Sequence, residues 1–246
     1  MEPPSRATAW RLGWPTPIDY NDNQGFCGGF NQQHEVNDGK CGVCGDAWDQ
    51  HPRPHEAPDG VYATGTIVKH YTQGQIINVT VDITSNHRGH FEFRICPDPE
   101  VEATQDCLDK HPLLLADGSG FKYNISLCTG DHNLQLCLPA HLTCTHCVLQ
   151  WRYVAGNNWG VCDDGTGALG CGPQEEFRAC ADLAILPLNP SSVFKSGENQ
   201  RRKVKKLSIA RKMHFIGPDC KKQISQEVCL SKQDTFLSGG QRKKRQ

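Results

Sequence analysis

Short stretches of alternating apolar and polar residues are the clearest pattern in this chain. In residues 77–84 the odd positions are Ile, Val, Val and Ile, and the even positions are polar. A period of two predicts a β-strand with one buried face and one wet face, so Asn78 should be exposed. The same alternation returns in three further predicted strands, at residues 91–95, 149–153 and 181–185.

The segments between these strands contain turn formers and no helical pattern. The first 60 residues are rich in Gly, Pro, Asn and Asp, so loops with short strands are expected there. No long stretch has the 3.6-residue period of an amphipathic helix. Short strands with turn-rich connections are typical of an antiparallel β-sandwich or barrel. We therefore predict an all-β fold with little helix.

The charge of the chain changes sign near residue 189. Residues 1–189 hold 11 Lys and Arg against 23 Asp and Glu, whereas residues 190–246 hold 15 against 4. The second part has few large apolar residues, so burial offsets little of its chain entropy. We predict a folded domain over 1–189 and a basic, largely flexible extension over 190–246. Cys220 and Cys229 could close a small loop within this extension.

The cysteine content indicates secretion. Fourteen cysteines in 246 residues are many for a reduced cytosolic protein, and an even number permits complete pairing. Sequons for N-glycosylation at Asn78 and Asn124 agree weakly with this. No hydrophobic signal segment opens the chain, and no apolar run is long enough to span a bilayer. We expect an extracellular protein whose leader lies upstream of this sequence.

Two CxxC pairs allow a second interpretation of four cysteines. The pairs Cys41/Cys44 and Cys144/Cys147 have the spacing that tetrahedral zinc sites use. In a reduced protein this spacing would favour zinc. The oxidising compartment that the other cysteines indicate favours disulfides, and the sequence alone leaves their connectivity open.

Candidate chemistry begins with a histidine between the first two predicted strands. If these strands form a hairpin, His87 lies at its tip, where a rigid sheet could hold a metal ligand. An ordinary surface histidine is the alternative, because the chain has 11 histidines. His90 could be a co-ligand by its spacing, or another surface residue.

Two adjacent carboxylates precede the last predicted strand. Glu175 and Glu176 could suggest acid–base hydrolysis, which uses a pair of carboxylates. Neighbours in an extended chain point to opposite faces, so this pair is not expected to flank one bond. Glu175 instead shares a face with Phe177.

Several longer motifs are spread over residues 1–187. They are Glu2-Pro3-Pro4-Ser5-Arg6-Ala7-Thr8, Tyr20-Asn21-Asp22-Asn23, Phe26-Cys27-Gly28-Gly29-Phe30, Gly39-Lys40-Cys41-Gly42-Val43-Cys44-Gly45-Asp46-Ala47, Asn86-His87-Arg88-Gly89-His90-Phe91-Glu92-Phe93-Arg94 and Cys180-Ala181-Asp182-Leu183-Ala184-Ile185. In this order they resemble the animal lytic polysaccharide monooxygenases, auxiliary activity family fifteen, also called chitin-binding type-4 domains. The resemblance implies an immunoglobulin-like or fibronectin-III-like β-sandwich with long loops and a flat, copper-carrying face.

The resemblance also implies roles for single residues. In the family an N-terminal histidine holds copper through its amino group and side chain, and a second histidine, which maps to His87, completes the site. Phe177 matches the axial aromatic residue, and Glu175 is the expected neighbour of the site on the same face. Imidazole and amine nitrogens suit copper and leave positions open for oxygen species.

The family implies an oxidative reaction. Its members use an external electron donor with O2 or H2O2 to break glycosidic bonds in chitin or cellulose. We therefore expect a secreted, monomeric, copper-dependent enzyme on a polysaccharide surface, with no nucleic-acid partner and no membrane span. A noncatalytic chitin-binding module is the alternative. A third interpretation is a matrix protein whose basic tail binds sulfated glycans.

One departure from the family concerns the chain start. Family members begin their mature chain with His a few residues before the Glu-Pro-Pro-Ser-Arg motif, whereas Met1 stands ahead of it here. We expect the natural chain to carry that histidine upstream. As written, the chain should bind copper poorly and should not catalyse.

Overall fold

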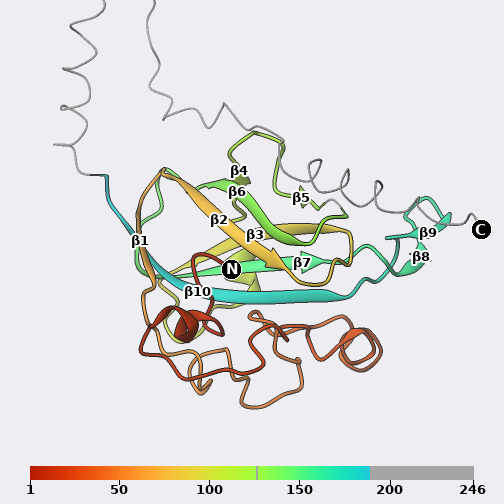
Figure 1. Cartoon of the computed structure of the whole chain (residues 1–246), viewed down its shortest axis with the longest axis horizontal. Helices are drawn as coiled ribbons and strands as arrows, with labels where there is room; N and C mark the ends of the chain where they lie inside the picture. Colours follow the sequence, from red (N-terminus) through yellow and green to blue (C-terminus); the bar gives the residue numbers. More distant parts are fainter. Residues whose placement is uncertain (126, 189–246) are drawn as a thin grey trace, which may run out of the picture.

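The computed structural model describes residues 1–125 and 127–188. Their strands form two facing sheets and a separate hairpin (Figure 1). The large sheet, in spatial order, consists of β1 (Lys69–Thr72), β10 (Glu176–Leu186), β7 (Cys144–Val154), β3 (His90–Pro97) and β5 (Tyr123–Asn124). The small sheet consists of β2 (Ile76–Ile83), β6 (Gly130–Cys137) and β4 (Leu114–Leu115), and the hairpin of β8 (Trp159–Val161) and β9 (Gly167–Leu169).

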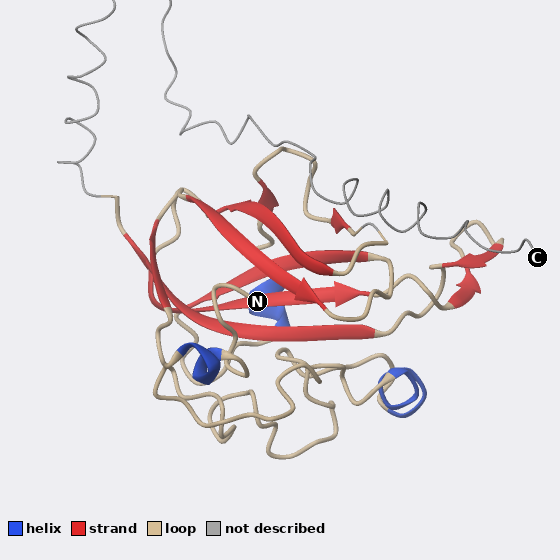
Figure 2. Cartoon of the chain, in the orientation of Figure 1, coloured by secondary structure: helices blue, strands red, loops and turns tan. Residues whose placement is uncertain are grey.

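The predicted all-β sandwich is confirmed, with one difference in strand direction. Every neighbouring pair of named strands is antiparallel except β1 and β10, which run parallel at one edge of the large sheet. Helices in the described residues are short, as expected, and loops make up most of the N-terminal third (Figure 2). The helices in the described residues are a 3-10 helix at Ala9–Leu12, a π-helix at Gln32–Val36 and α1 at Gln105–Asp109.

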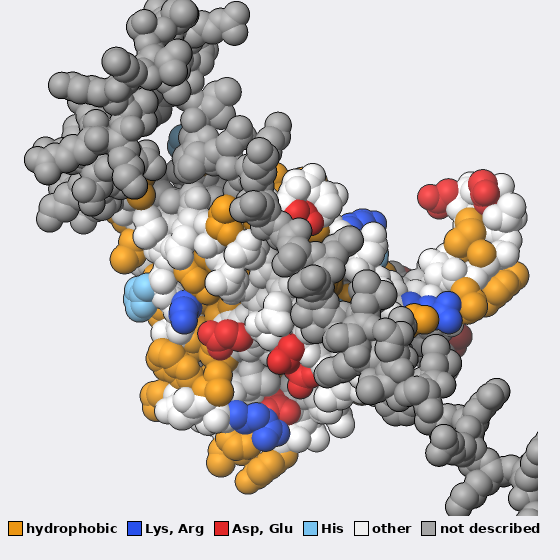
Figure 3. Space-filling view, turned by 45° about the horizontal axis from the view of Figure 1, so that its top comes forward, with side chains coloured by type: hydrophobic (Ala, Val, Ile, Leu, Met, Phe, Trp, Pro, Cys, Tyr) orange, Lys and Arg blue, Asp and Glu red, His pale blue; other side chains and the backbone are white. Residues whose placement is uncertain are grey.

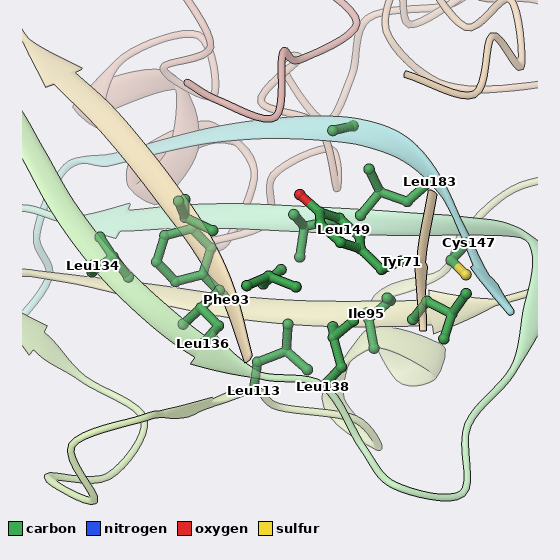
Figure 4. Packing of buried hydrophobic residues seen from close by; sticks show 14 of the residues in the cluster. Tyr71, Phe93, Ile95, Leu113, Leu134, Leu136, Leu138, Cys147, Leu149 and Leu183 are labelled. Atoms are coloured by element: carbon green, nitrogen blue, oxygen red, sulfur yellow. The ribbon is translucent and has the colours of Figure 1, made fainter. Parts of the chain in front are cut away.

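The core lies between the two sheets and follows the alternation of the strands. In β2 the even position Asn78 is exposed, as predicted, and the odd positions are buried. Phe93 of the large sheet lies near Leu134 and Leu136 of the small sheet, and Ile95 lies near Leu138 (Figure 4). Burial of each such side chain contributes roughly 1.5–3 kcal/mol. The buried positions of β2 are Ile77, Val79, Val81 and Ile83.

The outer face of the large sheet is covered by the N-terminal loops. The Cys44–Cys180 disulfide fastens this layer to β10, and the backbone N–H of Arg6 donates to the carbonyl of Cys180. The Arg6 guanidinium also donates to both carboxylate oxygens of buried Asp182, at 2.7 and 2.8 Å. The expectation of a wet face for residues 181–185 is therefore wrong, because loops without periodicity supply a second buried layer.

Disulfides, and not zinc, account for both CxxC pairs. Cys44 bonds to Cys180, and Cys144 bonds to Cys147 within β7. No described cysteine is free, and Cys128 and Cys137 are also disulfide-bonded. The remaining described pairs are Cys27–Cys41, Cys96–Cys107 and Cys162–Cys171.

Some predictions fall outside the described part of the chain. The basic extension over 190–246, with the possible Cys220–Cys229 loop, lies there. Within residues 1–125 and 127–188, no helix has the length and apolar character needed to cross a bilayer.

Candidate metal centre

His87 lies in the connection that crosses from the small sheet to the large one. Its segment follows β2 and precedes β3, and these two strands belong to different sheets. The predicted hairpin is therefore wrong, because alternation reports which face of a strand is buried but does not identify its neighbour. The position at one end of a rigid sandwich agrees with the prediction.

Polar and steric contacts hold this connection in one shape. Asn86 accepts a hydrogen bond from the backbone of Arg88 at 2.7 Å and donates one to the carbonyl of Cys128 at 2.7 Å. Gly89 has φ +80°, and a Cβ there would collide with the carbonyl oxygen of Val154 in β7. A side chain at Gly89 would push the loop away from the sheet, so only glycine permits this close approach.

The backbone of His87 is anchored to the large sheet on both sides of its Cα. Its N–H donates to the Tyr153 hydroxyl oxygen at 2.7 Å, and its carbonyl accepts from the Gly156 N–H at 2.8 Å. Burial raises the pKa of the Tyr153 hydroxyl to about 12, so this group stays neutral at physiological pH. Because the backbone makes these bonds, the imidazole ring remains available for other partners.

The ring of His87 contacts the two predicted site residues on β10 and the loop before it. Its centroid is 5.2 Å from that of Phe177, with 39° between the ring planes. Its Nδ1 lies 3.9 Å from Oε2 of Glu175 and 3.2 Å from the side-chain amide of Asn157. The side chains of His87 and Glu175 are 30% and 25% exposed. The structure thus brings together His87, Glu175 and Phe177.

The adjacent carboxylates point to opposite faces, as predicted. Glu176 is buried and accepts hydrogen bonds from Arg152 at 2.9 Å and from Arg178 at 2.7 Å. Although burial favours the neutral acid, these two guanidinium groups hold the pKa of Glu176 below its usual value. This carboxylate is neutralised inside the protein and is not a partner of Glu175 in hydrolysis.

His90 does not join the site. Its Nε2 is 3.0 Å from Oε1 of Glu92, two residues along the same strand face, and Glu92 also pairs with Arg94 at 2.7 Å. His90 therefore belongs to a row of ion pairs on the outer face of the large sheet, and the idea of a co-ligand is not supported.

Two neighbours of His87 were not predicted as site residues. Alternation in residues 149–153 places Tyr153 on the same side of its strand as Leu149, but it does not reveal that its hydroxyl meets another segment. Asn157 lies in a loop without periodicity, and no local pattern identifies it.

If a metal ion bound at this position, the described residues would supply one imidazole, that of His87. No group of three or more His, Cys, Asp or Glu side chains in residues 1–125 and 127–188 is arranged to hold a metal. A metal held at His87 would therefore need further donors from outside this set of side chains.

An arm next to the site exposes apolar side chains. The β8–β9 hairpin projects from the end of the sandwich, and hydrophobic side chains are visible along it (Figures 1 and 3). Trp159 is 67% exposed. The side chain of Gln174 bonds to the backbone N–H and carbonyl of Asn158, which joins the arm to the segment before Glu175.

Comparison with known proteins identifies the family. The sequence model of the family described as "lytic polysaccharide mono-oxygenase, cellulose-degrading" matches residues 1–183. The chain belongs to the lytic polysaccharide mono-oxygenases. A solved structure described as a lytic polysaccharide monooxygenase AA15 from Thermobia domestica in the Cu(I) state is 48% identical. The match has a TM-score of 0.72 and covers 75% of this chain and 96% of that one. No curated protein matches this mono-oxygenase.

Proposed function

We propose that this protein, together with the N-terminal histidine of its family, is a secreted, copper-dependent monooxygenase that cleaves glycosidic bonds in chitin, with cellulose as the second candidate substrate. The observation that carries this proposal is a histidine anchored by its backbone, whose ring faces an apolar aromatic side chain and a carboxylate. Support comes from family membership and from the copper-containing relative. The preference for chitin rests on the resemblance to animal members of the family.

The surroundings of His87 favour one ring nitrogen as the copper ligand. Glu175 can only accept hydrogen bonds when ionised, so it favours a proton on Nδ1 of His87. The Asn157 amide nitrogen faces Nδ1 at 3.2 Å; with the amide turned by 180°, which exchanges its nitrogen and oxygen, its oxygen would support the same tautomer. Nε2, which has no hydrogen bond to a described residue, is then free to bind the metal.

Copper at this position would supply one-electron chemistry and activation of an oxygen species, with electrons from an external donor. The protein residues would position and shield it. Phe177 has no donor atom, so its ring would keep one side of the site apolar and open. Glu175 would orient the imidazole through its carboxyl group, whose Oε2 lies 3.9 Å from Nδ1.

The remaining nitrogen ligands are proposed to come from a histidine upstream of Glu2. Glu2 and Thr80 form an antiparallel bridge with hydrogen bonds of 2.7 and 2.9 Å. Residues ahead of Met1 would therefore run along β2 towards Ile83, advancing about 3.3 Å each. Because the loop carrying His87 follows Ile83, a histidine a few residues upstream would approach His87.

The alternative function is a noncatalytic chitin-binding module. It would use the same end of the sandwich and the exposed Trp159 for adsorption, with no copper chemistry. Both functions place the protein outside the cell, which the extensive disulfide bonding supports, and both are proposed for a monomer. Oxidised sugar products that depend on copper and on an external donor with O2 or H2O2 separate the two.

The test compares two histidine variants of a protein that carries the upstream histidine. We expect His87→Ala to weaken copper binding at least about 100-fold, equivalent to about 2.8 kcal/mol, because a ligand is lost. His90→Ala is the matched control and should keep wild-type affinity, because His90 pairs with Glu92. Calorimetry and the copper EPR spectrum measure binding, and release of oxidised oligosaccharides measures activity. Near-wild-type copper affinity in His87→Ala would refute the assignment.

A further inference from the structure

Two disulfide-bonded cysteines lie at the ends of strand β6. Cys137 is its last residue, opposite Ile76 of β2. Cys128 precedes the strand, and its carbonyl accepts hydrogen bonds from the side chains of Asn86 and His132. Both cysteines are oxidised to disulfides.

These two cysteines cannot bond to each other. Residues 130–137 form a continuous strand, which spans about 23 Å at roughly 3.3 Å per residue. Even from His132, which contacts Cys128, about 16 Å of extended chain separates Cys137. A disulfide requires Cα atoms within about 7 Å of each other.

The other ten described cysteines are paired with one another. The chain has 14 cysteines, and the two that remain are Cys220 and Cys229 in the basic extension. We propose that each of these bonds to one of Cys128 and Cys137, so that residues 220–229 are stapled along β6. This replaces the local Cys220–Cys229 loop that the sequence suggested.

The spacing of the four cysteines supports the staple. Cys128 and Cys137 are nine residues apart, and so are Cys220 and Cys229. A segment that follows β6 in an extended conformation therefore reaches both ends of the strand without a bulge or a gap. If Cys220 and Cys229 bonded to each other in a local loop, their separation would not need to equal that of Cys128 and Cys137.

Charge selects the direction of the stapled segment. Asp82 of β2 lies directly opposite Asp131 of β6, and both side chains are exposed. Like charges in directly opposite positions destabilise a sheet, so a cation beside them would be stabilising. Lys221 and Lys222 follow Cys220 in the sequence. Bonding Cys220 to Cys128 would bring this lysine pair beside the acidic pair, and one of the two lysines would face it because neighbours in an extended chain point to opposite faces.

The staple would tie the basic extension to the folded domain. Strand β10 of the large sheet ends at Leu186, and the proposed bond of Cys220 would join the chain to the small sheet. One end of the staple adjoins Asn86, which bonds to the carbonyl of Cys128 beside the loop that carries His87. The proposal does not depend on the copper site.

The first experiment is disulfide mapping of the full chain produced in an oxidising secretory pathway. Digestion with pepsin at acid pH suppresses thiol–disulfide exchange, because exchange requires a thiolate. We expect mass spectrometry to find Cys128 linked to Cys220 and Cys137 linked to Cys229. A Cys220–Cys229 peptide, or a covalent dimer through either pair, would overturn the staple. Crossed links would overturn the charge-based direction.

Thiol counting in denaturant tests the same proposal independently. The double variant Cys220→Ser/Cys229→Ser should gain two free thiols, at Cys128 and Cys137. The double variant Cys162→Ser/Cys171→Ser is the matched control and should gain none, because these two cysteines bond to each other. No gain in the first variant would show that Cys220 and Cys229 bond to each other.

Discussion

At the scale of single residues, the backbone and the ring of His87 have different roles in the candidate site. Its backbone groups bond to Tyr153 and Gly156, and its ring faces Phe177 and Glu175. A ligand that is anchored through its main chain keeps its position while its ring nitrogen remains free. In the proposed copper site, this anchoring would position the imidazole before a metal binds and would lower the entropy cost of binding.

Phe177→Tyr tests the proposed axial position. We expect copper affinity to remain within about threefold of wild type, because no nitrogen ligand changes. The EPR and visible spectra should change, because a phenol oxygen would stand where a phenyl ring had no donor. Phe30→Tyr is the control, since Phe30 packs against His34 in another loop. An unchanged spectrum in Phe177→Tyr would move the axial role to another residue.

At the scale of elements, the β8–β9 hairpin needs support from the rest of the chain. Strands of three residues are marginal alone. The Cys162–Cys171 disulfide closes the hairpin, and Gln174 bonds its base to the sandwich. Gly167 lies against the Trp159 ring, where a Cβ would collide with the indole. The hairpin therefore presents Trp159 in a defined orientation next to the candidate metal centre.

Trp159→Ala tests this hairpin as a polysaccharide contact. Aromatic rings stack on apolar faces with about 1 kcal/mol beyond area burial, so we expect adsorption to crystalline chitin to fall at least about fivefold. Tyr20→Ala is the control. Tyr20 is 80% exposed and packs near Trp10 of the 3-10 helix, the dark red coil at the opposite end of the sandwich (Figure 1). Equal adsorption isotherms for the two variants would contradict the role of the hairpin.

At the scale of the whole molecule, buried ion pairs replace apolar contacts on the outer face of the large sheet. Asp182 bonds to Arg6 and His146, and Glu176 bonds to Arg152 and Arg178. Burial favours the neutral acid of Asp182, but the Arg6 and His146 hydrogen bonds outweigh it and lower its pKa. The layer of N-terminal loops is held to the sheet by these charges and by disulfides.

The contacts of Glu92 with His90 and Arg94 predict a loss of stability in acid. The hydrogen bond from His90, followed by pairing with Arg94, lowers the pKa of Glu92 from 4.5 to about 2. The stabilisation is therefore complete above pH 4.5 and is lost as the pH falls towards 2, up to about 3 kcal/mol. Guanidinium unfolding at pH 6 and pH 2.5 measures it. Glu92→Gln should be less stable at pH 6 but should lose less on acidification; equal losses would contradict the assignment.

Much of the fold was predictable because alternation is a local record of burial. The strand expected at 77–84 is β2, and the segment 91–95 lies within β3. The segments 149–153 and 181–185 lie within β7 and β10. The burial of both faces of β10 over residues 180–185 was not predictable, because the layer that covers the outer face comes from loops that carry no periodic signal.

The candidate site, like the fold, was predictable from the sequence only in part. The opposite orientations of Glu175 and Glu176 follow from the sequence, because consecutive side chains of an extended chain point to opposite faces. The family resemblance implied His87, Glu175 and Phe177 as one group, and the structure places Glu175 and Phe177 beside the His87 ring. Only the tertiary structure decided which strands pair, which cysteines bond and which hydroxyl anchors His87. These contacts join residues far apart in the chain, and a local pattern records the burial of one segment without recording the segment that buries it.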